Sequence, residues 1–417
     1  MNDDKKSLIG RKMYIPQMSF EASRLMAAAF KSAGLDAEPA PVSNSETLEL
    51  ARKYLLGDEC LPESVTLGNF LRIAEREDFE PSKTTFVMPT SNGPCRFGHY
   101  LHLAKKIFEE RGQGDILFFS PSSYGGYLDD IPDAQSVVRT GMQAIIAADV
   151  LRKMLYMNRP RELNKGDADK IYAISIEEIA EAIAEQDISG GRRLKNIVAA
   201  MIKMRDRFRN MPKDPEKNPI LIGIVGEIYC RFNDFSNNYL IRLIEELGGE
   251  AWISDIIEWV WYTNDEDKWR IISSGKRFSG KMLGHKIKSA VMKHDEHKIT
   301  SPFKQDFKGR EEPWPISKVL DLSAPYLPRD GAHGEMVLSI GKALWYRQKG
   351  AHGVIDISPF TCMNGIVTEA VYPRVSREHD NFPMKVFYFD GLHEDSRSEL
   401  EVFMELARNY RNRKNSD

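Results

Sequence analysis

Four cysteines are the residues of this 417-residue chain whose chemistry stands out: Cys60, Cys95, Cys230 and Cys362. They are widely spaced, and nothing like the compact C-x₂-C-x₂-C run of small ferredoxins is present. In a reducing compartment, thiols this scarce are either small buried hydrophobic groups or metal ligands. Their spacing alone leaves both interpretations open.

Short apolar runs alternate with helical periodicity through the first 132 residues, a pattern that indicates how these cysteines are positioned. The runs that predict strands lie at residues 13–18, 37–42, 84–89 and 115–120. The segments between them show the spacing of amphipathic helices. Such alternation is typical of a parallel sheet covered by helices on both faces.

The remainder of the chain predicts a helical segment and then a second sheet. Strand runs return at residues 220–225, 250–254, 353–357 and 385–390, whereas residues 259–315 show little pattern and are expected to be irregular. We therefore predict an α/β fold of two open parallel-sheet domains with a helical insert. The predicted boundaries are 1–132 for the N-terminal domain, 133–215 for the helical connector and 216–417 for the C-terminal domain.

The cysteines fall at equivalent places in this pattern. Cys95, Cys230 and Cys362 each follow a predicted strand and precede a helix, and Cys60 lies in a turn before a helix opened by Pro62. Ligands of open α/β sheets bind at the carboxyl ends of the strands. A helix N-terminus there also favours the thiolate that binds metal. Ligands from both domains would place a metal cluster in the cleft between them.

Three charged residues lie beside this pattern. Arg96 and Arg231 directly follow two of the cysteines, so they either offset the negative charge of a thiolate-ligated cluster or form surface salt bridges. Glu335 begins a predicted helix, where it suits the helix dipole and could also act as a proton donor or an outer partner of a cluster. No catalytic residue is identified by these patterns.

Two other motifs are weaker. Residues 275–281 (GKRFSGK) fit G-x-x-x-x-G-K, but Met282 replaces the hydroxyl residue that holds Mg²⁺, so a surface loop is the better interpretation. Residues 294–297 (HDEH) lack the spacing of H-E-x-x-H and indicate a solvated charged helix or loop. G-x-G-x-x-G is absent, which argues against a dinucleotide-binding domain of the usual kind.

Charge and hydropathy narrow the class of protein. With 58 basic and 61 acidic residues, the formal charge of −3 offers no global field for nucleic acid or an anionic membrane, and we expect neither partner. The N-terminal residues lack the apolar core of a secretory signal, and no run reaches the ~20 apolar residues that span a bilayer. These features predict a cytoplasmic protein, in which structural disulfides are disfavoured.

Six stretches, taken in order, carry a resemblance to a known family: GDECLPESVTLGNFL, PTSNGPCRFGHYLHL, GEIYCRFNDFSNNYLIRLIEELGGE, GAHGEMVLSIGKAL, SPFTCMNGIVTEA and FYFDGLHEDSRSELEVF. The chain resembles the 2-hydroxyacyl-CoA dehydratase and benzoyl-CoA reductase superfamily. Within it, the chain is most similar to the acyl-CoA dehydratase activase-related (CoA protein activase) proteins. The resemblance covers residues 57–403, most of the chain.

The resemblance implies stacked flavodoxin-like domains and a [4Fe–4S] cluster ligated by Cys60, Cys95, Cys230 and Cys362. It also implies an ATP-dependent, ASKHA-type activase as electron donor. No sequence feature identifies an acyl-CoA pocket, so the substrate does not carry over; an acyl-CoA substrate and a homodimer or heterodimer stay open alternatives. Four thiolates would close the cluster and favour low-potential electron transfer, whereas three would leave one iron open for substrate. Double-cubane members of the superfamily use more cysteines than this chain has, which disfavours that cluster.

Two alternatives stay open beside this expectation. The four cysteines could hold zinc as a non-catalytic scaffold. The chain could also be an ordinary α/β enzyme or binding protein whose thiols are simply buried.

Overall fold

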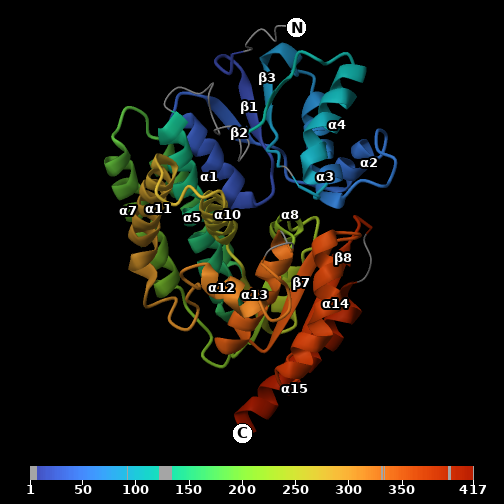
Figure 1. Cartoon of the computed structure of the whole chain (residues 1–417), viewed down its shortest axis with the longest axis vertical. Coiled ribbons are helices and arrows are strands. Elements are labelled where there is room, and N and C mark those ends of the chain that lie inside the picture. Colours follow the sequence, from blue (N-terminus) through green and yellow to red (C-terminus); the bar gives the residue numbers. More distant parts are fainter. Residues whose placement is uncertain are drawn as a thin grey trace. The chain divides into compact units, whose positions relative to one another are not determined.

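A computed structural model describes residues 7–91, 93–121, 134–329, 332, 334–392 and 396–416 of the chain (Figure 1). The chain divides into two compact units. Unit 1 comprises Met1–Ala148 and Ile176–Ile197, and unit 2 comprises Asp149–Ser175 and Val198–Asp417.

Unit 1 is built on a four-stranded parallel sheet in the order β2-β1-β3-β4. Each strand is short and the connections between neighbouring strands are helical, as parallel pairing requires. The elements of its first segment are β1 (Lys12–Ile15), α1 (Phe20–Lys31), β2 (Asp36–Pro39), α2 (Ser45–Ala51), α3 (Leu61–Ala74), η1 (Pro81–Lys83), β3 (Thr84–Val87), α4 (Phe97–Glu110) and β4 (Leu117–Phe119).

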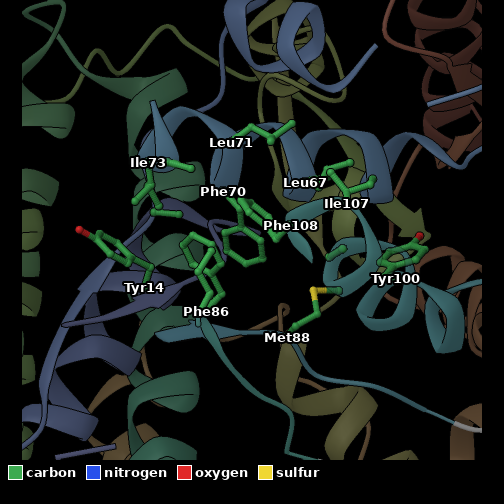
Figure 2. Packing of buried hydrophobic residues seen from close by; sticks show 14 of the residues in the cluster. Tyr14, Leu67, Phe70, Leu71, Ile73, Phe86, Met88, Tyr100, Ile107 and Phe108 are labelled. Carbon is green, nitrogen blue, oxygen red and sulfur yellow. The ribbon is translucent and has the colours of Figure 1, made fainter. Parts of the chain in front are cut away.

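The core of unit 1 is aromatic. Phe86 of β3 is fully buried and stacks on Phe70 of α3, with ring centroids 4.3 Å apart. Phe108 of α4 also packs against Phe86, with ring centroids 5.4 Å apart. One phenylalanine of β3 therefore contacts both α3 and α4 (Figure 2). Tyr100 lies at the margin of this cluster, with its hydroxyl directed away from the core. These contacts hold the helices α3 and α4, which follow Cys60 and Cys95 in the chain, against the sheet.

Unit 2 is built on a second four-stranded parallel sheet, in the order β6-β5-β7-β8. Its elements beyond residue 219 are β5 (Ile220–Gly226), α8 (Ile228–Phe232), α9 (Leu240–Glu246), β6 (Gly249–Ile253), α10 (Ile256–Ser273), α11 (Gly280–Thr300), η3 (Ser301–Phe303), α12 (Ser317–Ser323), α13 (Glu335–Gln348), β7 (Gly353–Pro359), α14 (Met363–Glu378), β8 (Met384–Phe389) and α15 (Ser396–Ser416).

The two sheets share one topology. In each, the first strand of the unit lies between the second and the third, and the fourth lies outside the third. This is the order in which flavodoxin-like sheets begin, and it creates a switch point between the first and third strands. The prediction of an α/β fold with two parallel sheets is therefore confirmed. The apolar run ILIGIVG of β5, buried along its whole length, is the kind of sequence that a two-sided parallel strand requires.

Residues predicted as a helical connector form three helices that both units share. They are α5 (Ala134–Asn158), α6 (Asp167–Ala184) and α7 (Gly190–Asn210), with η2 (Arg159–Arg161) after α5. The division between the units falls within each of these helices. The segment is thus helical as expected, and part of it belongs to each unit.

The expectation of irregular structure over residues 259–315 is wrong. Helices α10 and α11 occupy much of this segment. The helical periodicity is weak because α11 buries few of its residues: Met282, Met292, Asp295 and Ile299. A helix with so narrow a buried face gives little apolar contrast in the sequence. Among the described residues, no helix combines the length and the apolar content that crossing a membrane requires.

Two helical glycines of unit 2 provide a test of its packing. A Cβ at Gly341 of α13 would overlap the main-chain oxygen of Val319, whereas a Cβ at Gly284 of α11 would meet open space. We expect Gly341→Ala to lower the free energy of unfolding by about 1–3 kcal/mol through overpacking. Gly284→Ala should raise it by up to about 1 kcal/mol through helix propensity.

Urea unfolding followed by tryptophan fluorescence measures both effects, because all six tryptophans of the sequence lie in unit 2. Equal destabilisation by the two substitutions would contradict the packing described for α12 and α13.

Candidate functional site

Two of the four cysteines lie at the switch point of the unit 2 sheet. Cys230 is on α8, which follows β5, and Cys362 is the N-cap residue of α14, which follows β7. The strands β5 and β7 are parallel neighbours, so both thiols are at the carboxyl edge of the sheet. Cys230 is fully buried and Cys362 is partly buried. The predicted position of this pair at the strand ends is confirmed.

A partly buried carboxyl group, Glu227, contacts Cys230 and acts on Cys362 through its charge. Its main-chain N–H donates to the Ile357 oxygen at 2.8 Å, which extends the β5–β7 ladder by one bond. Its side chain accepts from the main-chain N–H groups of Tyr229 at 3.0 Å and Cys230 at 2.8 Å. Glu227 therefore caps α8 and fixes the direction in which Cys230 leaves the strand.

The glycine before this carboxylate explains how the chain approaches so closely. Gly226 has a φ of 111°, a backbone conformation that side-chain-bearing residues rarely adopt. A Cβ there would overlap the main-chain oxygen of Ile357 on the neighbouring strand. The glycine thus allows β5 to turn into α8 directly against β7.

Charge and burial disfavour the thiolate of Cys362. Burial, the charge of Glu227 and, to a lesser extent, that of Glu335 raise the pKa of this thiol to about 12, against the effect of main-chain N–H groups at the start of α14. Burial also raises the pKa of Glu227, and burial together with the Glu227 charge raises that of Glu335 well above its usual range. The guanidinium of Arg231 opposes both carboxyl shifts.

Buried polar atoms at this edge lack hydrogen-bond partners among the described residues. They are Nε of Arg231, Oε1 of Glu335 and Oδ1 of Asn364. The other carboxyl oxygen of Glu335 accepts from Nδ2 of Asn364 at 3.2 Å, so these residues belong to one polar cluster. Unsatisfied buried polar atoms are costly, and such a group in a native fold calls for a functional explanation.

Arg231 and Glu335 therefore both lie near the unit 2 cysteines, and their role beside a cofactor stays a prediction. Arg231 is buried, with its guanidinium 4.9 Å from the centroid of the Phe232 ring, and it does not have the exposure of a surface salt bridge. Glu335 is the first residue of α13 and is also buried.

Sequence reasoning missed three members of this cluster: Glu227, Asn364 and Asp356. Asp356 lies inside β7, accepts from Tyr372 at 2.7 Å and Ser358 at 3.2 Å, and has a pKa that burial raises. The sequence signal for Asp356 was an acidic residue within an otherwise apolar predicted strand. Glu227 could have been noticed as the acid directly after the buried β5 run, whereas Asn364 carries no sequence signal of its own.

The other two cysteines lie at the carboxyl edge of the unit 1 sheet. Cys60 is the N-cap residue of α3, and its Sγ is 2.8 Å from the hydroxyl of Tyr100 on α4. Cys95 is exposed, lies just before α4, and accepts from the Phe97 N–H at 3.5 Å. The guanidinium of Arg96 donates to the main-chain oxygen of Asp58, two residues before Cys60. The predicted site residues of unit 1 thus also gather at one edge.

Each unit therefore provides two thiols at the ligand-binding edge of its sheet. Among the described residues, no three His, Cys, Asp or Glu side chains converge with the geometry of a metal site. The donor chemistry fits a thiolate-ligated metal: soft sulfur donors, with the unpaired Nε–H of Arg231 available to a negative group. Burial and the charges of Glu227 and Glu335 favour the protonated thiol of Cys362, so metal binding would have to displace that proton.

Comparison with known proteins adds no assignment: a scan against family models and a search of curated proteins find no match.

The pKa of Cys362 predicts its reactivity. In metal-free protein at pH 8, we expect iodoacetamide to modify exposed Cys95 readily and Cys362 slowly, because only the thiolate reacts and a pKa of about 12 keeps the thiol protonated. Glu227→Gln removes one opposing charge while keeping an oxygen to cap α8, so Cys362 should react faster in this variant. Site-resolved mass spectrometry measures both rates, with urea-unfolded protein as the reference. Equal rates for the two cysteines in the folded wild type would contradict the prediction.

Glu63→Gln tests a buried carboxyl near Cys60. Burial and the charge of Glu59, opposed by Arg96, raise the pKa of Glu63 to about 7. The folded protein therefore retains a proton that the unfolded chain releases, and stability falls as pH rises from about 4.5 to about 7. We expect the variant to be about 1 kcal/mol more stable than wild type at pH 8 and equally stable at pH 4.

Urea unfolding followed by circular dichroism at the two pH values measures this difference. Glu49→Gln, at an exposed position of α2, is the control and should show no such pH dependence. A gain of the same size at both pH values would show that the titration of Glu63 is not its cause.

Proposed function

We propose that this chain is an iron–sulfur protein of low-potential electron transfer, with Cys60, Cys95, Cys230 and Cys362 as ligands of a [4Fe–4S] cluster. One observation carries the proposal: every cysteine of the chain lies at the carboxyl edge of a parallel sheet, two in each unit. Cysteines that were merely buried would have no reason to share that edge. The expected site in the cleft between the two domains is part of this proposal.

The local chemistry supports a thiolate-ligated cluster. Cys60 is the N-cap residue of a helix of 14 residues, where free N–H groups and the helix dipole favour negative charge. Cys362 has the same position on a helix of 16 residues, but burial and the charge of Glu227 outweigh this effect there. Arg231 supplies a buried positive charge with an unpaired Nε–H. Hydrogen bonds to ligand sulfurs and nearby charge set the potential of such clusters. The Tyr100 hydroxyl beside Cys60 is one such group.

The roles of the protein residues follow from their contacts. The cluster, when bound, supplies a site that accepts and passes on one electron. Glu227 orients Cys230 by capping α8, Tyr100 orients the Cys60 sulfur, and Arg231 offsets negative charge at the unit 2 edge. With four thiolate ligands the cluster is closed, which favours electron transfer over direct dehydration of a substrate.

The proposed electron donor is an ATP-dependent activase of the ASKHA type, and the proposed chemistry downstream is of the acyl-CoA dehydratase type. Both rest on the resemblance of the cysteine-bearing stretches. A homodimer or heterodimer belongs to the same proposal.

Anaerobic purification of the full chain tests the proposal. We expect broad brown absorbance and about four iron ions per chain. Single Cys→Ser substitutions at the four positions should each lower bound iron to below about half. Ala351→Ser is the matched control, because it places a hydroxyl at a buried position of the amino edge of β7 and should leave the iron content unchanged.

Two outcomes would contradict this assignment. Stoichiometric zinc with no visible absorbance would support the Cys₄ zinc scaffold instead. Metal-free protein from anaerobic cells, with Cys→Ser variants that lose only stability, would show that the thiols are simply buried.

A further inference from the structure

The segment from Ser273 to His294 differs in charge from the chain as a whole. It covers the end of α10, the connecting turn and most of α11, shown in yellow to orange in Figure 1. Six of its residues are Lys or Arg and none is Asp or Glu, in a chain of formal charge −3. The expectation that the protein has no membrane partner rested on the formal charge of the whole chain. That charge does not reveal this strongly basic segment.

Helix α11 is anchored to unit 2 along one narrow face. Met282 and Met292 are buried, and Ser279 caps the helix by accepting from the Met282 N–H. His285 adds a contact of 2.8 Å to the Asn264 oxygen on α10. The helix is therefore held against α10, and its remaining surface is directed to solvent.

The opposite face of α11 carries an exposed apolar stripe. Leu283, Ile287 and Val291 are spaced by four residues, which places them on one face of the helix, and they are 62%, 58% and 38% exposed. Phe278, in the turn before the helix, is 98% exposed. Single exposed apolar residues are ordinary, but a row of them beside an exposed phenylalanine marks an interaction surface. We call these four residues the α11 stripe.

Lysines flank the α11 stripe on both sides. At 100° per residue, Lys286 and Lys288 lie to either side of Ile287, and both are exposed. The segment itself has no acidic residue. In the part of the chain that the structure describes, Lys276, Lys281, Lys286 and Lys288 form no ion pair with a carboxylate. Their charges are thus available to an external anionic partner.

We propose that the α11 stripe and its lysines bind an anionic phospholipid surface. An apolar row flanked by lysines suits a helix that lies in the membrane interface, with the side chains of the row among the acyl chains and the ammonium groups at the headgroups. Anionic lipids attract each such lysine. Nucleic acid would leave the aliphatic row without a partner. Protein interfaces favour aromatic residues and Arg at their centres and are depleted of Lys, which disfavours an acidic protein. The inference does not depend on the proposed cluster.

Helix α15 offers a matched control. Val402 and Leu406 are also spaced by four residues and are 65% and 54% exposed, but Glu401 and Glu405 lie directly beside them. These glutamates form ion pairs with Arg397 and Arg408, so the apolar residues of this face have no lysines directly beside them to attract an anionic lipid surface. Substitutions there change as much exposed apolar surface without touching the basic segment.

Co-sedimentation of the full chain with phospholipid vesicles tests the proposal. We expect binding to vesicles that contain phosphatidylglycerol, much weaker binding to phosphatidylcholine alone, and loss of binding as salt is raised. Leu283→Ser with Ile287→Ser, and separately Lys286→Glu with Lys288→Glu, should each weaken binding about tenfold or more. Val402→Ser with Leu406→Ser should leave it unchanged. All positions are exposed, so circular dichroism should show unaltered folding.

Absence of binding to anionic vesicles by the folded wild type would overturn the proposal. Equal losses in the α11 and α15 variants would do the same, since the stripe would then have no special role. Binding to soluble polyglutamate without binding to vesicles would assign the surface to an acidic protein instead.

Discussion

The parallel pairing of β5 with β7 is the constraint on which the unit 2 site depends. It brings Cys230 and Cys362, which are 132 positions apart in the sequence, to the ends of neighbouring strands at one edge of the sheet. The close approach requires a glycine at Gly226, and the next residue completes the ladder through its main-chain N–H. The backbone therefore places Glu227 where its carboxyl group accepts from the Cys230 N–H and its charge raises the pKa of Cys362.

A second group of buried charged residues in unit 2 forms ion pairs. Lys342 is fully buried on α13, and its ammonium group contacts Glu258 at 2.6 Å and Glu312. Glu312 also contacts Lys153, and these lysines hold its pKa down to about 2 despite burial. Breaking one such pair would leave an uncompensated buried charge, which costs several kcal/mol. Arg231 is also buried, but its Nε–H has no hydrogen-bond partner among the described residues, a property it shares with Nε of Arg329 and Arg347 in the same unit.

The fold could be predicted from the sequence wherever one strand or helix has a strong pattern of its own. Apolar runs such as Ile220–Gly226 predict parallel strands, and the residues that follow a run are predicted to lie at the carboxyl edge of the sheet. Helix α11 was missed because so little of it is buried. At the site, the sequence pointed to the cysteines, to the arginines that directly follow two of them, and to Glu335. The contact between Glu335 and Asn364 joins residues 29 positions apart, and no local pattern encodes which side chains the folded backbone will bring together.

The division of α5, α6 and α7 between the two units has a consequence for biosynthesis. The chain passes from unit 1 to unit 2 at residue 149, returns at 176 and leaves again at 198. Unit 1 is therefore incomplete when β4, its last strand, emerges from the ribosome. It must wait for about 80 further residues, among them a segment that belongs to unit 2, before its final helical parts are available. The two units are thus interleaved along the chain, and a truncation between β4 and residue 198 would remove helical residues that belong to unit 1.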